Sequence, residues 1–228
     1  VSHEEWVEAR KAHMAKEKEF TRLRDQLSQE RRNLPWERVD KDYICEGPDG
    51  SRSLAQLFGD SKQLVIYHFM YAPEWDAGCK SCSFWADNFN LIAPHLRARD
   101  ISFVAVSRAP IDTLEAYKKR MGWKFPWFSS GGNDFNYDYH VSFTPDEIAN
   151  HRGLYNYAMI EIDDETDYPG ISVFFKADDG TIYHTYSAYS RGIDLLNGAY
   201  NYIDLTPKGR DEGDRSVSWL RRRDEYDG

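Results

Sequence analysis

Residues 63 to 86 read QLVIYHFMYAPEWDAGCKSCSFWA, and this stretch decides the expected fold. Its first eight residues are apolar at nearly every position, which is typical of a strand buried on both faces of a parallel sheet. A loop follows, and then Cys79 and Cys82 form a C-x-x-C pair at the start of a segment with helical character. Open α/β proteins place their sites at the carboxyl ends of such strands. The stretch therefore predicts a central strand that delivers a cysteine pair to the functional edge of a sheet.

The order of elements after this strand predicts an α/β domain. Helical signals run from Ser83 to Arg99, a second buried strand from Ile101 to Val106, and a second helix from Ile111 to Met121. This β-α-β-α order indicates a parallel sheet core.

Later segments extend the sheet and make it mixed. Residues 171 to 175 and 181 to 185 are strand-like and flank the turn at Asp178, Asp179 and Gly180, as in an antiparallel hairpin. A helix near residues 192 to 202 is expected to close the domain.

The first third of the chain begins with one long predicted helix, residues 2 to 33. Ser2 followed by Glu5 is a capping-box pattern, and the interior contains no Gly or Pro. Its apolar stripe is too thin to be covered well by a single small domain, so we expect a homodimer formed through this helix. The stripe consists of Trp6, Ala9, Phe20, Leu23 and Leu27.

These patterns divide the chain into three parts. We expect residues 1–35 to be a helical extension, residues 36–209 to be the α/β domain with an unassigned insertion near 131–168, and residues 210–228 to be a charged, mobile C-terminal tail.

Composition narrows the class of protein. Among 228 residues, 29 are Lys or Arg and 38 are Asp or Glu, and the net charge of -9 repels nucleic acid. No apolar run approaches the twenty or so residues of a membrane span, and the start VSHEE is too polar for a secretory signal. We therefore expect a cytoplasmic protein with no membrane partner. Three cysteines in that compartment are expected to be reduced, so the close pair needs a reason other than a structural disulfide.

Redox chemistry is the first interpretation of the pair. Cys79 at a helix start meets unpaired N–H groups that favour a thiolate, while Cys82, one turn further on, is placed to resolve a mixed disulfide. Lys80 favours the thiolate, whereas the acidic Glu74 and Asp76 oppose it, so the direction of the net change in the Cys79 pKa stays open. This chemistry requires no cofactor. It requires a disulfide-containing or oxidised substrate and a thiol reductant as partners.

Three other interpretations of the chain stay open. The cysteines can be two small buried apolar residues, or half of a metal site completed by His184, His68 or Cys45 in a metal-binding or metal-delivery module. The chain can also be a non-catalytic interaction protein that recruits a partner through its long helix.

Arg108, at the carboxyl end of the second strand, is a candidate for stabilising a thiolate or holding an anion, with a surface salt bridge as its alternative.

Several uncommon segments, spread over nearly the whole chain, resemble the bacterial DUF899 family. That family is thioredoxin-like and close in layout to alkyl hydroperoxide reductase and thiol-specific antioxidant proteins, so the resemblance implies a thioredoxin-like fold and no particular substrate. The segments are EKEFTRLRD (17 to 25), RRNLPW (31 to 36), YHFM (67 to 70), GCKSCSFWAD (78 to 87), SRAP (107 to 110), RMGW (120 to 123) and HTYSAYSRG (184 to 192).

The resemblance also identifies departures and one further site residue. Thioredoxin-type sites carry Trp before the first cysteine, where this chain has Gly78, and peroxiredoxins carry a hydroxyl residue where this chain has Asp76. The resemblance therefore does not imply standard peroxidase chemistry. Pro169 stands where thioredoxin-like folds carry a cis-proline facing the cysteines, although Pro169-Gly170 is also an ordinary turn sequence.

Overall fold

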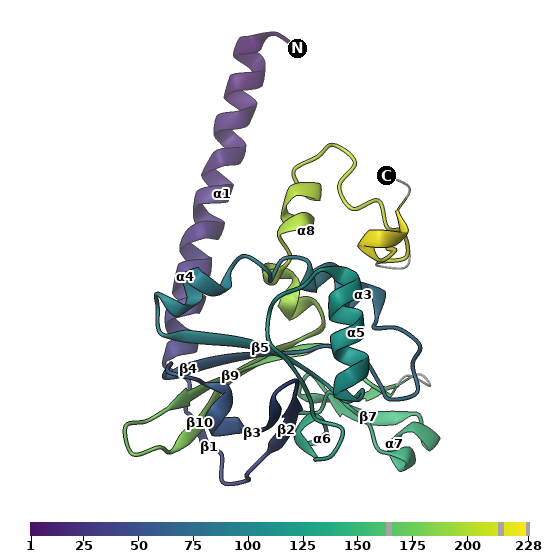
Figure 1. The fold of residues 1–228 in the computed structure, drawn as a ribbon. Helices are drawn as coiled ribbons and strands as arrows, with labels where there is room; N and C mark the ends of the chain where they lie inside the picture. Colours follow the sequence, from purple (N-terminus) through teal and green to yellow (C-terminus); the bar gives the residue numbers. More distant parts are fainter. Residues whose placement is uncertain (163–165, 214–216, 227–228) are drawn as a thin grey trace. The chain divides into compact units, whose positions relative to one another are not determined.

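The computed structural model describes residues 1–162, 166–213 and 217–226, and it consists of two units, Val1–Trp36 and Glu37–Gly228 (Figure 1). The first unit is the helix α1, His3–Arg32. Its capping box is formed as expected, because the Ser2 hydroxyl accepts from the Glu5 N–H at 3.2 Å and the Ser2 N–H donates to the Glu5 carboxylate at 2.6 Å. Within the described residues, no helix combines the length and the apolar character that crossing a bilayer requires.

The second unit is organised around a mixed sheet of eight strands in the order β1-β10-β9-β4-β5-β6-β2-β3. The central strands β4, β5 and β6 are parallel, and the other pairings are antiparallel. The strands are β1 Glu37–Arg38, β2 Ile44–Gly47, β3 Gly50–Ser53, β4 Gln63–His68, β5 Ile101–Ser107, β6 Trp127–Ser129, β9 Gly170–Lys176 and β10 Ile182–Tyr189.

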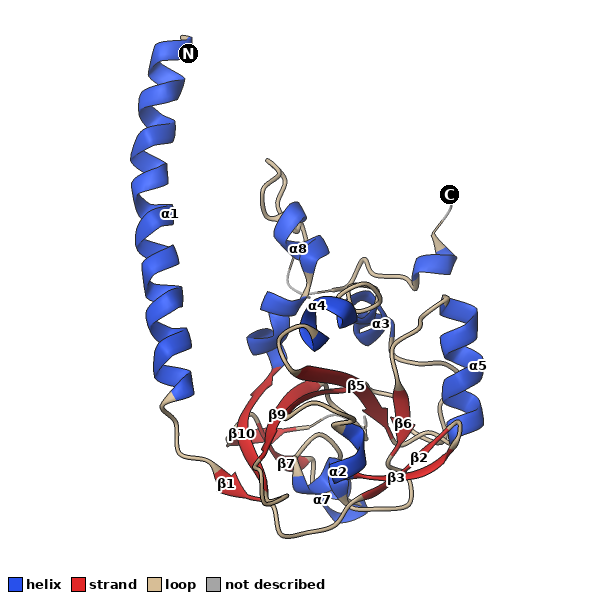
Figure 2. Ribbon diagram, turned by 60° about the vertical axis from the view of Figure 1, so that its left-hand side comes forward, coloured by secondary structure: helices blue, strands red, loops and turns tan. Residues whose placement is uncertain are grey.

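Helices cover both faces of this sheet, with α3, α4 and α8 on one side and α2 on the other (Figure 2). The architecture is a thioredoxin-like α/β fold preceded by a long helix, as predicted. The helices of this unit are α2 Leu54–Leu57, α3 Lys80–Ala86, α4 Ala93–Arg97, α5 Ile111–Met121, α6 Phe135–Asp138, α7 Pro145–Ala149 and α8 Gly198–Ile203, with 3-10 turns η1 Ser190–Leu196 and η2 Arg223–Glu225.

Two apolar clusters lie on opposite faces of the sheet. The cysteine-side cluster packs α3 and α5 against the sheet and includes Tyr67, Phe69, Cys82, Leu114 and Trp127. The opposite-side cluster packs α2 and α6 against the other face and includes Leu54, Leu64, Ile66, Phe135 and Phe174.

The helical signals from Ser83 to Arg99 do not correspond to one continuous helix. The structure has two short helices there, and the first begins at Lys80. The side-chain amide of Asn88 donates to the carbonyl oxygens of Phe84 at 2.9 Å and Trp85 at 3.2 Å, and this competes with the next helical turn.

The helix expected near residues 192 to 202 is also interrupted. Here Asn197 separates η1 from α8, and its side chain caps α8 by accepting from the Tyr200 N–H at 3.1 Å.

The insertion near 131–168 has its own small core. It contains α6, α7 and a two-stranded sheet of β7, Arg152–Tyr155, and β8, Ala158–Glu161. The buried apolar residues of this small core are Val141, Phe143, Tyr155 and Ile162, which pack with Tyr189 of β10.

The charged C-terminal tail packs on the domain where it is described. Leu220 is only 2% exposed, and Arg120 of α5 pairs with Asp224 at 2.6 Å and Glu225 at 3.1 Å. Residues 217–226, in the tail that the sequence predicted to be mobile, thus make defined contacts with the domain.

Leu114 tests the importance of the cysteine-side cluster. It is fully buried on α5, so Leu114→Ala should lower the free energy of unfolding by about 2 to 5 kcal/mol through lost burial and a cavity. Leu91→Ala is the matched control, because Leu91 is 85% exposed and its truncation should cost less than about 0.5 kcal/mol. Urea unfolding of both variants measures the difference, and equal losses would contradict this account of the core.

Candidate active site

Cys79 lies at the end of the loop that follows β4, directly before the first turn of α3. It is the N-cap of α3, its thiol makes no capping hydrogen bond, and its side chain is partly exposed. Its N–H donates to the Met70 carbonyl at 3.1 Å, and its carbonyl accepts from the Ser83 N–H at 2.9 Å and the Ser83 hydroxyl at 2.8 Å. These bonds fix the backbone of Cys79 and leave its sulfur facing a cavity.

Cys82 lies one turn later and is 1% exposed. The Met70 N–H points at its sulfur, 3.4 Å away, and the Tyr67 hydroxyl faces the same thiol. Burial raises the pKa of the Cys82 thiol well above its usual range, the neighbouring Cys79 raises it further, and Tyr67 and the Met70 N–H oppose both effects. Cys82 is therefore held as a protonated thiol in the reduced protein, in which all three cysteines are free.

A cavity of about 530 Å³ opens beside the two sulfurs. Its walls come from α3, from the insertion, from the segment before β9 and from the chain after β10. It is lined by Tyr67, Met70, Cys79, Ser81, Cys82, Trp85, Tyr155, Tyr168, Pro169, Ser190, Arg191, Ile193, Asp194, Tyr200, Arg210, Glu212 and Val217.

Two charged groups of the cavity wall are already paired within the protein. The Arg210 guanidinium contacts Asp194 at 3.0 Å and Asp204 at 2.8 Å and lies 3.8 Å above the Tyr200 ring. Glu212 accepts from the Tyr200 hydroxyl at 2.6 Å and from the Trp219 indole at 2.9 Å. These charges organise the wall, and the surface beside the cysteines is mainly aromatic and apolar.

Pro169 lines the cavity together with the two cysteines. Its carbonyl accepts from the Tyr155 hydroxyl at 2.6 Å, which joins the insertion to the strand β9 that follows. The described residues contain no cis peptide bond, so the bond between Tyr168 and Pro169 is trans.

Arg108 does not line the cavity, although it follows β5 at the predicted edge. Its guanidinium donates to Asp167 at 2.7 Å and to the Tyr137 hydroxyl at 3.1 Å, and its side chain is 12% exposed. Asp167 also accepts from the Ser142 hydroxyl, so a mostly buried ion pair ties the insertion to the sheet. The geometry thus gives Arg108 a structural partner in place of the thiolate or anion proposed from the sequence.

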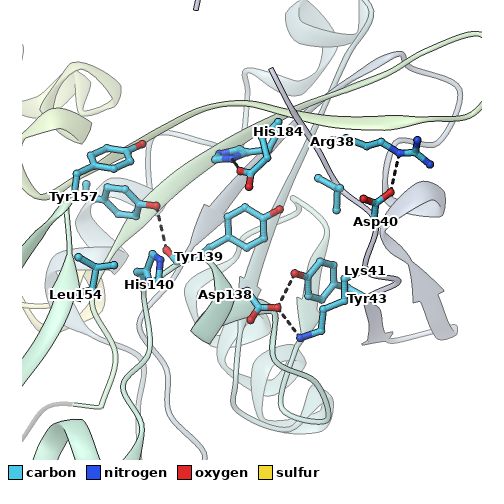
Figure 3. A pocket seen from close by; sticks show the side chains of 13 residues that line it. Arg38, Asp40, Lys41, Tyr43, Asp138, Tyr139, His140, Leu154, Tyr157 and His184 are labelled. Atoms are coloured by element: carbon cyan, nitrogen blue, oxygen red, sulfur yellow. Dashed lines mark hydrogen bonds and ion pairs between the residues drawn. The ribbon is translucent and has the colours of Figure 1, made fainter. Parts of the chain in front are cut away.

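His184 lies on the face of the sheet opposite the cysteines, where it packs against Tyr139 and Phe174. It lines a separate cavity of about 340 Å³ with Tyr43, Tyr139 and Asp138 (Figure 3). The proposed metal set of Cys79, Cys82 and His184 is therefore not assembled. In the part of the chain that the structure describes, no three His, Cys, Asp or Glu side chains gather in a way that could hold a metal ion.

A buried chain of hydrogen bonds leads inward from His184. A bulge in β10 after His184 turns Ser187 to the same face, where the His184 Nε2 and Ser187 Oγ atoms are 2.7 Å apart. Ser187 bonds Ser172 at 2.8 Å, and Ser172 bonds the Nε2 atom of His68 at 2.8 Å. His68 is thus a buried histidine with a hydrogen-bond partner, in line with the commoner role of a histidine inside a strand.

His68 should make the protein sensitive to acid. Burial, helped by the nearby His184, lowers the pKa of His68 to about 3. Below about pH 6.5 His68 takes up a proton in the unfolded chain but not in the folded one. The contribution of His68 to the free energy of unfolding is therefore fully present above that pH, and it falls by about 1.4 kcal/mol per pH unit toward pH 3. Denaturant unfolding at several pH values should show this slope reduced in His68→Gln and unchanged in His13→Gln, an exposed control. Equal slopes in the two variants would contradict it.

The sheet order, the helix α3 and the cysteine pair at the carboxyl end of β4 define the class of this molecule as a thioredoxin-like α/β protein. The model of the family described as "Bacterial protein of unknown function (DUF899)" matches residues 1–226, and the chain belongs to that family. No curated protein matches the sequence significantly.

Solved structures with a similar arrangement include peroxiredoxins. Peroxidoxin BcpB from Mycobacterium tuberculosis is 14% identical, with a TM-score of 0.47 over 72% of this chain and 94% of that one. A PrxQ mutant from Xylella fastidiosa is 14% identical, with a TM-score of 0.41 over 72% and 90%. A hypothetical protein from Sinorhizobium meliloti 1021 is 14% identical, with a TM-score of 0.42 over 75% and 82%. These likenesses transfer no activity or substrate to this chain.

Sequence reasoning missed most of the cavity wall. Tyr155 lies in the insertion that had no assignment, and Arg210 and Glu212 lie in the tail that was expected to be mobile. Tyr67 was assigned only to a buried strand, although period-two alternation places it on the cysteine side of β4. That alternation is the one signal in the sequence that could have identified it.

Proposed function

We propose that this protein is a thiol-disulfide oxidoreductase in which Cys79 attacks and Cys82 resolves. The observation that carries this proposal is the asymmetry of the pair: both cysteines line the cavity, but Cys79 is partly exposed, whereas Cys82, one turn later, is only 1% exposed. The Cys79 thiolate attacks one sulfur of a substrate disulfide, and that S–S bond breaks as the other sulfur leaves as a thiolate and takes up a proton. Cys82 then attacks Cys79, releasing the second substrate thiol and forming the Cys79–Cys82 disulfide. An external thiol reductant supplies the two electrons that restore the pair.

The electrostatics around Cys82 support this order of events. Part of the pKa rise at Cys82 comes from Cys79, and that part disappears when Cys79 becomes neutral in a mixed disulfide. Tyr67 and the Met70 N–H, which favour the Cys82 thiolate, remain in place. Cys82 therefore stays inactive before the first step and becomes easier to deprotonate after it, when the resolving thiolate is required.

The cavity supports a substrate with an apolar body. The wall includes five aromatic side chains and four other apolar residues, and its charged residues Arg210 and Glu212 are paired within the protein. Pro169 is proposed to position the substrate, because it faces the same cavity. A reducing, cytoplasmic location is part of the proposal, since recycling of the pair requires a thiol reductant.

The two rival interpretations of the cysteine pair gain less support. The metal proposal lacks a third ligand, because His184 lies across the sheet from the cysteines and no three His, Cys, Asp or Glu side chains of the described residues gather in a way that could hold a metal ion. A purely structural pair would not require one thiol to be partly exposed at a cavity while its neighbour is buried.

Replacement of single cysteines tests the two roles. Cys82→Ser should accumulate a mixed disulfide through Cys79, because the resolving thiol is gone, and Cys79→Ser should abolish turnover of a small disulfide substrate. Peptide mapping by mass spectrometry identifies the trapped cysteine. Cys45→Ala is the control, since Cys45 lies on β2 outside the cavity and its buried thiol has a pKa raised to about 11.

Two results of that experiment would reject the assignment. Trapping through Cys82 alone would reverse the roles, and oxidation of Cys45 alone would remove the redox function. Assays with peroxide beside the disulfide show whether the same pair also reduces peroxide.

We also propose that the protein self-associates through α1. Its apolar stripe includes Trp6, Phe20, Leu23 and Leu27, each at least half exposed in the chain, and a single helix has no means of burying its own stripe. Light scattering should give a dimer for the full chain and a monomer for Phe20→Ser combined with Leu27→Ser. Met14→Ser, about 120° around the helix, should leave the dimer intact. A monomeric full-length protein would remove the idea.

A further inference from the structure

The C-terminal segment, defined here as residues 220–226, reaches the loop that carries Cys79. Arg222 donates two hydrogen bonds to the Gly78 carbonyl, from Nε at 3.1 Å and from Nη2 at 2.9 Å. The two residues are 144 positions apart in the sequence. Both bonds end on the peptide unit that immediately precedes Cys79.

Gly78 sits where no side chain can be accommodated. A Cβ atom at this position would lie 2.8 Å from Phe69 and 2.9 Å from Tyr117, both buried rings of the cysteine-side cluster. This explains why glycine, and not the tryptophan of thioredoxin-type sites, precedes the first cysteine. The close approach also holds the Gly78 carbonyl in the position where Arg222 binds it.

The guanidinium adds a positive charge from a distant part of the chain to that of Lys80, the residue that follows Cys79. The Arg222 side chain is 22% exposed, and its Nη1 atom is held by Glu225 at 3.0 Å. The charge is felt by the surrounding rings, because burial raises the pKa of Tyr71 and Tyr117 and Arg222 opposes the rise at both. Glu74, one of the two acids upstream of Cys79 that oppose a thiolate, accepts a hydrogen bond from the Thr166 hydroxyl at 3.1 Å.

We propose that Arg222 is a positioning residue that fixes the Gly78–Cys79 peptide and supplies the positive charge that stabilises the Cys79 thiolate. The inference rests on the proposed function in taking Cys79 as the attacking thiol. It assigns to the C-terminal segment a role in the site, since the cation predicted at Arg108 is committed to Asp167.

Charge and anchoring are separated by two substitutions at the same position. Arg222→Met keeps much of the aliphatic stem and removes the charge, so it should raise the apparent pKa of Cys79 by about one unit. Arg222→Lys keeps the charge and should stay close to the original value. The measurement is the rate of iodoacetamide alkylation at Cys79 against pH, followed by peptide mapping of the full chain.

Arg120→Met is the matched control for loosening of the segment. Arg120 anchors the same segment through Asp224 and Glu225 without touching Gly78, so its loss should shift the Cys79 profile less than Arg222→Met does. An unchanged profile in Arg222→Met, or equal shifts in Arg222→Met and Arg222→Lys, would overturn the proposal. Alkylation does not depend on turnover, so a failure of the proposed oxidoreductase activity would be recognised separately by the absence of a trapped mixed disulfide.

Discussion

Burial of β4 on both faces is the constraint around which the second unit is arranged. Val65 and Tyr67 face the cysteine-side cluster, while Leu64, Ile66 and His68 face the other way. A strand without a solvent-exposed face must lie centrally, and β5 and β9 satisfy its backbone on both edges. The chain continues from the carboxyl end of this central strand into the loop and helix that carry the cysteines.

The first residues beyond β4 position the two cysteines. Once the strand ends, the peptide groups of Met70 become available, and they bind both cysteines: the carbonyl accepts from the Cys79 N–H and the N–H points at the Cys82 sulfur. One backbone unit thus sets the distance of both thiols from the sheet. The resulting difference leaves Cys79 partly exposed and Cys82 buried, which is the asymmetry that the proposed two-step exchange needs.

The two faces of the sheet serve different purposes. The cysteine side combines aromatic rings with a cavity, whereas the opposite side holds a hydrogen-bonded chain of His68, Ser172, Ser187 and His184. Such a chain gives buried polar groups partners, although the Nδ1 atom of His68 has none among the described residues. A packed sheet separates the two sides. His184 on β10 and the cysteine sulfurs at α3 therefore do not meet, although the sequence suggested them as ligands of one metal site.

The sequence by itself determined the class of fold, the long capped helix and the position of the cysteine pair. Those features depend on local signals: the apolar run of β4, the second run of β5, the hairpin turn at Asp178 to Gly180 and the capping box at Ser2 and Glu5. It also carried the family resemblance. What it lacked was the identity of the distant groups that surround the pair, because residues such as Tyr155, Arg210 and Glu212 are far from the cysteines along the chain.

Only the tertiary structure decided which charges and rings reach the cysteines. Arg108, adjacent to a strand end as predicted, is paired with Asp167, and Arg222, from a segment without a regular pattern, binds the carbonyl of Gly78, the residue before Cys79. Local sequence also favoured a longer helix after Cys82, which a side-chain amide at Asn88 ended. Such outcomes follow from long-range pairing, in which a side chain binds whichever partner the packed core brings within hydrogen-bond reach. Periodicity and composition carry no information about that choice.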